Sequence, residues 1–243
     1  MLFGFWMYQK VKYKEQPEEG EQNSKSIMKI ISTNIGEPRI VHWKGKEIKT
    51  GIFKYPVGQS IFLGAKDVEN DHVIDRRYHG GIDKACYLYS ADHYEYWQKL
   101  YPELEMPFGI FGENLTVEGL HEAQVNIGDI FKIGEAVIQA AQPRQPCFKL
   151  EFRFNSDEIV RQFVDSGFSG VYVRVLEKGN VKTGDSMELI EKKDALSIQK
   201  VFELLYTSEF QKEAVEQAVN NPFIAASCRK DFLKRWGDQL FIP

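Results

Sequence analysis

The sequence predicts a mainly β protein that carries a small helical region at its C-terminal end. After Met28 the chain consists of short strand-like runs separated by glycine, proline and asparagine turns, which is typical of an antiparallel barrel or sandwich. From Ser197 onward apolar residues recur at helical spacing instead. From Gln9 to Ser26 the chain is polar and charged, so we expect a poorly ordered extension before Met28. The predicted divisions are therefore an extension at 1–27, a β domain at 28–192 and a three-helix domain at 193–243.

Composition limits the classes of protein to which this chain can belong. Its 243 residues are 43% hydrophobic and 27% charged, and the net charge of −4 offers no general attraction to nucleic acid or anionic membrane. The first apolar run, 2–8, is too short to span a bilayer, and no basic residue precedes it as in a secretory signal. Three cysteines without Cys-x-x-Cys spacing favour neither a zinc knuckle nor a disulfide scaffold. They are typical of a reducing cytoplasm, where we expect the protein to be located.

Hydrophobic alternation and turn residues place the individual elements. Strands are expected at 28–34, 48–55, 61–63, 85–89, 130–133, 136–141, 171–177 and 187–191. Turns are expected at 45–46 and 178–180, and a loop that leads into a strand at 108–119. One helix should run from residue 90 or 91 to about 101. A second should begin after Ser156 or Asp157 and stop at Gly167, and three more segments with helical spacing follow Ser197.

A long polar loop at 66–83 is the first candidate for function, since loops of this length inside a compact domain are unusual. The ten-residue segment 75–84, at the end of this loop, carries three cations, an imidazole and two adjacent glycines: Arg76, Arg77, Lys84, His79, Gly80 and Gly81. Glycines let the backbone approach a ligand closely, and arginine and lysine can neutralise a phosphate. A solvated hairpin turn, with glycines required only by its geometry, is the alternative.

The second candidate is Cys147, at the end of a segment that joins a strand-like run to an amphipathic one. Pro143 and Pro146 fix two backbone angles, so this connection should be stiff. Arg144 lies three residues upstream, and a helix is expected to start close to the cysteine. Both features favour the thiolate, the form that binds metals or attacks electrophiles. The alternative is a buried structural cysteine behind two turn prolines.

Five motifs in this order resemble the MOSC family, the β-barrel domain similar to the C-terminal domain of molybdenum-cofactor sulfurases. They are Gly51-Ile52-Phe53-Lys54-Tyr55-Pro56-Val57, the run from Arg77 to Ala85, Phe111-Gly112-Glu113-Asn114-Leu115-Thr116, Ile127-Gly128-Asp129, and Pro143-Arg144-Gln145-Pro146-Cys147. With the helical C-terminal region, the chain looks like the YiiM-type subgroup. The resemblance covers nearly everything from Met28 to Trp236 and implies a MOSC-type barrel with inserted helices.

The resemblance implies a molybdenum cofactor (Mo-molybdopterin), with the Cys147 thiolate as a protein ligand to the metal. It further implies reduction, and so detoxification, of N-hydroxylated purines or amidoximes, without pyridoxal phosphate. The expected cofactor contacts are Lys54, Arg76, Arg77, Gly80, Gly81, Lys84, Asn114 and Arg144. His79 and Glu113 join Cys147 as expected catalytic residues that handle protons.

The electron source should be a separate reductase or redox protein, because the chain has neither a dinucleotide fingerprint nor a cysteine cluster for iron and sulfur. The helical region could dock this donor or form a homodimer. Two other functions use the same thiol. Cys147 could carry a persulfide in a sulfur- or cofactor-carrier protein, or it could act with His79 as base in a cysteine hydrolase.

Overall fold

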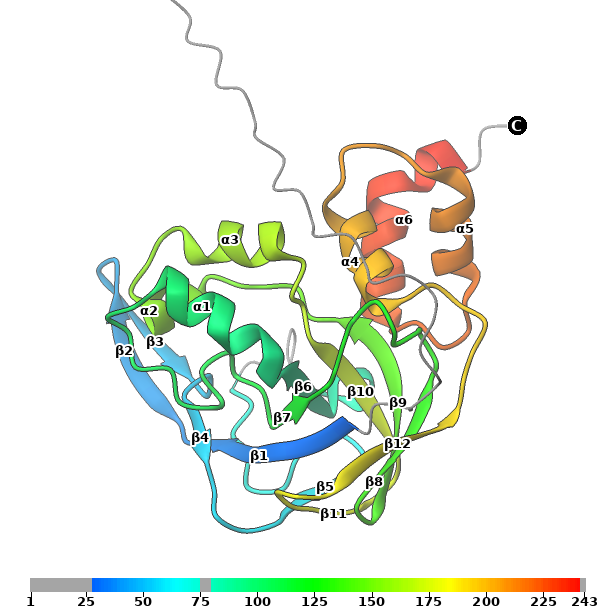
Figure 1. Cartoon of the computed structure of the whole chain (residues 1–243). Coiled ribbons are helices and arrows are strands. Elements are labelled where there is room, and N and C mark those ends of the chain that lie inside the picture. The colour runs from blue at the N-terminus through cyan, green and yellow to red at the C-terminus, as the bar shows by residue number, and fades with distance from the viewer. Residues whose placement is uncertain (1–27, 75–79, 241–243) are drawn as a thin grey trace, which may run out of the picture.

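A computed structural model describes residues 28–74 and 80–240, and its centre is a closed β-barrel of seven strands (Figure 1). The strand order is β12-β8-β9-β10-β6-β7-β1, and β1 pairs with β12 to close the barrel. The barrel strands are β1 (Met28–Gly36), β6 (Cys86–Ser90), β7 (Leu115–Glu118), β8 (Ile130–Ile133), β9 (Ala136–Pro143), β10 (Val171–Glu177) and β12 (Ser186–Glu191). The predicted fold class, a mainly β barrel with added helices, is confirmed.

Alternate side chains of β6 contribute to two separate hydrophobic cores. Cys86 and Leu88 point into the barrel, where they pack with aliphatic side chains of the other strands. Tyr87 and Tyr89 point outward into an aromatic cluster that includes Trp97. Because successive side chains of a strand face opposite sides, one five-residue strand serves both cores.

The helices α1 (Tyr94–Leu100), α2 (Lys149–Phe154) and α3 (Ile159–Ser166) lie together on one side of the barrel (Figure 1). Their inner faces and the outer face of β6 enclose the aromatic cluster, in which Trp97 and Phe163 stack with ring centroids 6.0 Å apart. Two short 3-10 turns, Ile82–Lys84 and Ala91–His93, precede β6 and α1. Gly167 ends α3 in the left-handed conformation, as its sequence position predicts.

The short strands outside the barrel correct two details of the sequence prediction. They are β2 (Arg39–Trp43), β3 (Lys46–Thr50), β4 (Lys54–Pro56), β5 (Ile61–Leu63) and β11 (Gly179–Val181). The single strand expected at 48–55 is wrong: it divides after Thr50, where a Cβ on Gly51 would lie 1.8 Å from the His72 carbonyl oxygen. The turn expected at 178–180 is instead largely strand, because Gly179 begins the pairing of β11 with β5.

Three helices form the C-terminal region, as predicted: α4 (Ile198–Tyr206), α5 (Lys212–Asn220) and α6 (Ala226–Leu240). Ser197 caps α4, since its Oγ accepts a hydrogen bond from the Lys200 backbone N–H at 3.1 Å. Most buried apolar side chains of these helices belong to the same core as the barrel interior, whereas Phe202 joins the aromatic cluster. The Ala225 N–H also donates to the Ala141 carbonyl at 3.0 Å. A separate domain at 193–243 therefore stays a prediction, and the predicted extension at 1–27 lies outside the described residues.

Within the described ranges, no helix combines the length and the apolar character needed to cross a bilayer.

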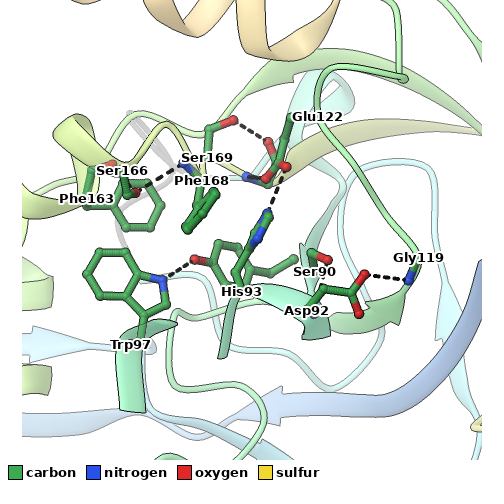
Figure 2. Close-up of polar contacts among 12 residues, drawn as sticks. Ser90, Asp92, His93, Trp97, Gly119, Glu122, Phe163, Ser166, Phe168 and Ser169 are labelled. Atoms are coloured by element: carbon green, nitrogen blue, oxygen red, sulfur yellow. Dashed lines mark hydrogen bonds and ion pairs between the residues drawn. The ribbon is translucent and has the colours of Figure 1, made fainter. Parts of the chain in front are cut away.

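A buried imidazole–carboxylate pair ties the helical side to the barrel (Figure 2). His93 Nε2 lies 2.9 Å from one Glu122 oxygen, and the other oxygen accepts the Gly170 N–H at 2.8 Å. The imidazole also stacks on Phe168, with ring centroids 3.8 Å apart. We call His93, Glu122, Phe168 and Gly170 the His93 cluster. Both oxygens of the Glu122 carboxylate have a partner inside the protein, which indicates a structural role for the cluster.

Candidate functional site

One pocket collects most of the predicted site residues that the structure describes. It lies between the end of β3, the segment 71–74, and the connection from β9 to α2. We call it the cysteine pocket. The predicted residues that line it are Lys54, Gly80, Lys84, Asn114, Arg144 and Cys147. Sequence segments almost 100 residues apart therefore meet at one place.

Cys147 is the accessible thiol among the three cysteines of the chain. It is half-buried, whereas Cys86 and Cys228 are buried. Burial raises the pKa of Cys86 to about 12 and also raises the pKa of Cys228, so both remain protonated and unreactive at neutral pH. Cys147 stands two residues before α2, and its carbonyl accepts the Leu150 N–H at 3.0 Å. Of the two predicted alternatives, a fully buried structural cysteine does not match this position.

Arg144 places a buried positive charge against the pocket. Its side chain is only 4% exposed, and its guanidinium carbon lies 5.3 Å from the ring centroid of Tyr87 and 5.2 Å from that of Phe163. One terminal nitrogen, Nη1, is buried and has no hydrogen-bond partner within the described structure. Burial acts to lower the pKa of Arg144, but Tyr87, Tyr172 and Cys147 outweigh it and raise the pKa. The guanidinium therefore stays charged, with one donor unused.

Lys54 is already paired. Its ammonium forms an ion pair with the buried carboxylate of Asp71, which also accepts hydrogen bonds from Asn114 Nδ2 at 3.1 Å and from the Gly36 N–H at 3.0 Å. Asn114 Oδ1 in turn accepts the Tyr87 N–H at 3.3 Å. This network fixes Lys54 and Asn114 at the pocket wall and uses much of their hydrogen-bonding capacity.

Lys84 approaches the pocket from the opposite side, beside α6. Its Nζ lies 5.9 Å from the ring centroid of Tyr172, which also lines the pocket. Burial lowers the pKa of Lys84, and the nearby Asp231, Cys228 and Asp83 partly offset this effect. Asp83 itself accepts the Ala226 N–H at the start of α6 at 2.8 Å. The loop end that carries Lys84 is thus attached to the C-terminal helices.

Glu113 does not line the pocket, contrary to the sequence prediction. It is fully buried, and its Oε1 accepts hydrogen bonds from the Tyr94 hydroxyl, from the Gly109 N–H at 2.7 Å and from Thr116 Oγ1 at 3.0 Å. The neighbours Gly112 and Asn114 do line the pocket. The Glu113 side chain points instead towards α1, where Tyr94 is its hydroxyl partner. Gly81 also stands outside the lining, next to Gly80.

Three other predicted residues, Arg76, Arg77 and His79, lie outside the described residues, so their roles stay predictions. The structure adds pocket residues that sequence reasoning missed: Asp71, His72, Tyr87, Lys149 and Tyr172. Asp71 and His72 fall in the loop that was singled out, and a search for the acidic partner of Lys54 could have found Asp71. The two tyrosines carry no such signal, because outward-facing strand aromatics usually serve packing.

Comparison with known proteins agrees with the motifs and the fold. A family model described as MOSC domain matches residues 75–188. YflK from Bacillus subtilis is 38% identical over 209 residues, which are 85% of this chain and 93% of YflK. A protein named Reductase from Gibberella moniliformis is 35% identical over 164 residues, 65% of this chain but 29% of that protein. The crystal structure of YiiM from Geobacillus stearothermophilus has a TM-score of 0.73 and 34% identity, covering 86% of this chain and 98% of YiiM. The chain belongs to the MOSC domain family, with YiiM among its structural relatives.

Proposed function

We propose that this protein is a molybdenum-cofactor-dependent oxidoreductase that reduces N-hydroxylated compounds, with Cys147 as a ligand of the metal. One observation carries the proposal: the accessible thiol of Cys147 shares a pocket with Arg144, a buried guanidinium that has an unused donor. A soft sulfur ligand beside an uncompensated cation suits an anionic, thiol-bound metal cofactor. The matched relative named Reductase supports a redox function.

The pocket residues fit this cofactor in their donor chemistry. Arg144 Nη1 offers a buried hydrogen-bond donor with no protein partner, which a phosphate or a pterin oxygen would satisfy. In residues 28–74 and 80–240, no group of three or more His, Cys, Asp or Glu side chains could hold a metal ion. Among the residues that the structure describes, we assign Cys147 as the protein ligand and the remaining ligands of the metal to the dithiolene of the cofactor.

Different pocket residues would hold different parts of the cofactor. We assign charge neutralisation to Arg144 and Lys84, and close backbone approach to Gly80, which lines the pocket with a φ of 76°. Asn114 stands where its amide can orient the pterin while it remains bonded to Asp71. The cofactor, when bound, supplies the two-electron chemistry at the metal.

The protein must also manage protons, because conversion of an N–OH group to N–H takes up two electrons and two protons and releases water. Among the described lining residues, Lys84 is suited to supply a proton, since burial lowers its pKa and so makes its ammonium a stronger acid than that of an exposed lysine. Burial raises the pKa of both Tyr87 and Tyr172, so their hydroxyls stay protonated and act only as hydrogen-bond donors. His79 remains a second proposed proton carrier, and the electrons would come from a separate reductase or redox protein.

The test is to produce the protein in a host that makes molybdenum cofactor, measure its molybdenum content, and assay reduction of N-hydroxyadenine with a coupled reductase. We expect about one molybdenum per chain, and a rate at least about 100-fold lower for Cys147→Ser, since a hydroxyl is a poor ligand for a soft metal centre. Cys86→Ala is the matched control, because it removes a buried thiol that lies outside the pocket lining and should leave activity unchanged.

A carrier function would give a different result. Labile sulfur on Cys147, without molybdenum even after reconstitution and without turnover, would support a persulfide carrier and reject the oxidoreductase. Thiol-sensitive esterase activity that is lost in Cys147→Ser, again without metal, would support the hydrolase instead.

A further inference from the structure

Two arginines outside the cysteine pocket share one pair of aromatic rings. The guanidinium carbon of Arg39, on β2, lies 5.1 Å from the ring centroid of Phe53 and 5.2 Å from that of Tyr55. The guanidinium carbon of Arg153, on α2, lies 4.9 Å and 5.2 Å from the same two centroids. Segments more than 100 residues apart in the sequence therefore bring two positive charges to one place.

This pair of charges is not compensated within the described part of the chain. No carboxylate there forms an ion pair with Arg39 or Arg153, and Arg153 Nε and Nη2 are buried without a hydrogen-bond partner. Burial lowers the pKa of Arg153, Tyr55 and Glu113 partly offset this effect, and the positive charge of Arg39 adds a smaller lowering. An anion that bridges the two guanidiniums would offset their mutual repulsion and satisfy the unpaired donors of Arg153.

Both arginines lie next to pocket residues. Arg39 is paired across the β2–β3 hairpin with Thr50, which lines the cysteine pocket. Arg153 follows the lining residue Lys149 by four positions on α2, so both face the same side of the helix, about 6 Å apart along its axis. An anionic group at the arginine pair would therefore stand at the rim of the pocket, about one helical turn beyond Lys149.

We propose that Arg39 and Arg153 form a binding site for a phosphate monoester, and that this site receives the phosphate of a nucleotide substrate whose base enters the cysteine pocket. A phosphate monoester carries nearly two negative charges and several acceptor oxygens, which match two guanidiniums. Phe53 and Tyr55 hold both guanidiniums by their ring faces and limit their freedom before the ligand arrives. The assignment to a substrate rests on the proposed function, whereas the phosphate site itself does not.

Calorimetric titration of the full chain with inorganic phosphate, adenosine monophosphate and adenosine tests the site without any turnover. We expect the monophosphate to bind at least about tenfold more tightly than adenosine, and Arg153→Gln or Arg39→Gln to remove most of that difference. Arg161→Gln, on the exposed face of α3, is the matched control and should retain it. Arg39 is exposed on an edge hairpin, so its variant should fold even if the Arg153 variant does not. Two results would show that the arginines do not form a phosphate site: equal affinity of the wild type for adenosine monophosphate and adenosine, or an undiminished preference for the monophosphate in Arg39→Gln.

The source of the phosphate is decided with cofactor-loaded protein. If the monophosphate binds equally well before and after loading, and if Arg39→Gln raises the KM for the N-hydroxylated nucleotide but not for the free base, the phosphate belongs to the substrate. If loading abolishes monophosphate binding, the pair holds the cofactor phosphate, and the substrate assignment is wrong. Phosphate binding through both arginines in a protein with no reductase activity would reject the proposed function and leave the phosphate site in place.

Discussion

The cysteine pocket and the His93 cluster are both built around buried charged groups beside β6, but they differ in how these groups are satisfied. In the His93 cluster each Glu122 oxygen has a partner within the protein, and the imidazole is held by Phe168 (Figure 2). In the pocket, Arg144 is equally buried but keeps a nitrogen with no partner in the described structure. Because an unpaired buried donor costs stability, its presence indicates a ligand, whereas the completed cluster indicates a structural role.

The pocket itself contains both kinds of charge. Lys54 is paired with Asp71, which two further donors hold in place, so this part of the wall resembles the His93 cluster. Arg144, in contrast, lies beside the aromatic rings of Tyr87 and Phe163, and no carboxylate of the described residues pairs with it. Lys54 therefore contributes to the stability of the fold, whereas Arg144 remains available to a ligand.

The largest effect on stability is expected from Glu122→Ala. It leaves His93 and the Gly170 N–H without their partner, and removal of one member of a buried pair typically costs about 3–5 kcal/mol. Chemical denaturation should show this loss, while the activity per folded molecule remains near that of the wild type. Unchanged stability together with lost activity would contradict the structural role of the cluster.

A somewhat smaller loss, about 3 kcal/mol, is expected from Lys54→Met. The substitution leaves Asp71 as an unpaired buried carboxylate, although the hydrogen bonds from Asn114 and Gly36 remain. The midpoint of urea unfolding measures the change. The double variant Lys54→Met with Asp71→Asn should recover part of the lost stability, since no charge is then left unpaired; a failure to recover would mean that the pair is not the source of the effect.

Arg144→Met should behave in the opposite way. Removing a buried charge that has no carboxylate partner should leave the free energy of unfolding within about 1 kcal/mol of the wild type or raise it. Cofactor retention should fall at least about tenfold, because a charge-assisted contact is lost. Differential scanning fluorimetry and molybdenum analysis of the same preparation report the two effects. A destabilisation as large as that of Glu122→Ala would remove the distinction between the two regions.

The smallest effect is expected from Phe168→Leu, which keeps an apolar side chain but removes the ring that stacks on His93. Such a ring contact contributes about 0.5–1.5 kcal/mol beyond the burial of its area. Thermal unfolding should show a small decrease, and cofactor retention should not change. A fall in cofactor retention would show that the His93 cluster acts on the pocket.

The fold and the position of the accessible thiol could be predicted from the sequence, but only part of the pocket could. Turn residues and alternation located the barrel strands, and the prolines around Cys147 marked the connection that places it beside the pocket. Glu113 was misplaced because its motif gives no information about which side of the segment faces the pocket. Tyr87 and Tyr172 were missed because β6 and β10 are far apart in the sequence, although they are neighbouring strands of the barrel in which the two tyrosines pair in register.

The amino-acid sequence by itself determined the local features: the strands, the cap of α4 at Ser197, the end of α3 at Gly167, and a cysteine after a proline-stiffened turn. These depend on backbone preferences and side-chain periodicity within a few residues. Only the tertiary structure decided which charges are paired. Asp71 reaches Lys54, and no carboxylate among the described residues forms an ion pair with Arg144, because closure of the barrel and packing of α2 bring together groups whose distance in the chain says nothing about their distance in space.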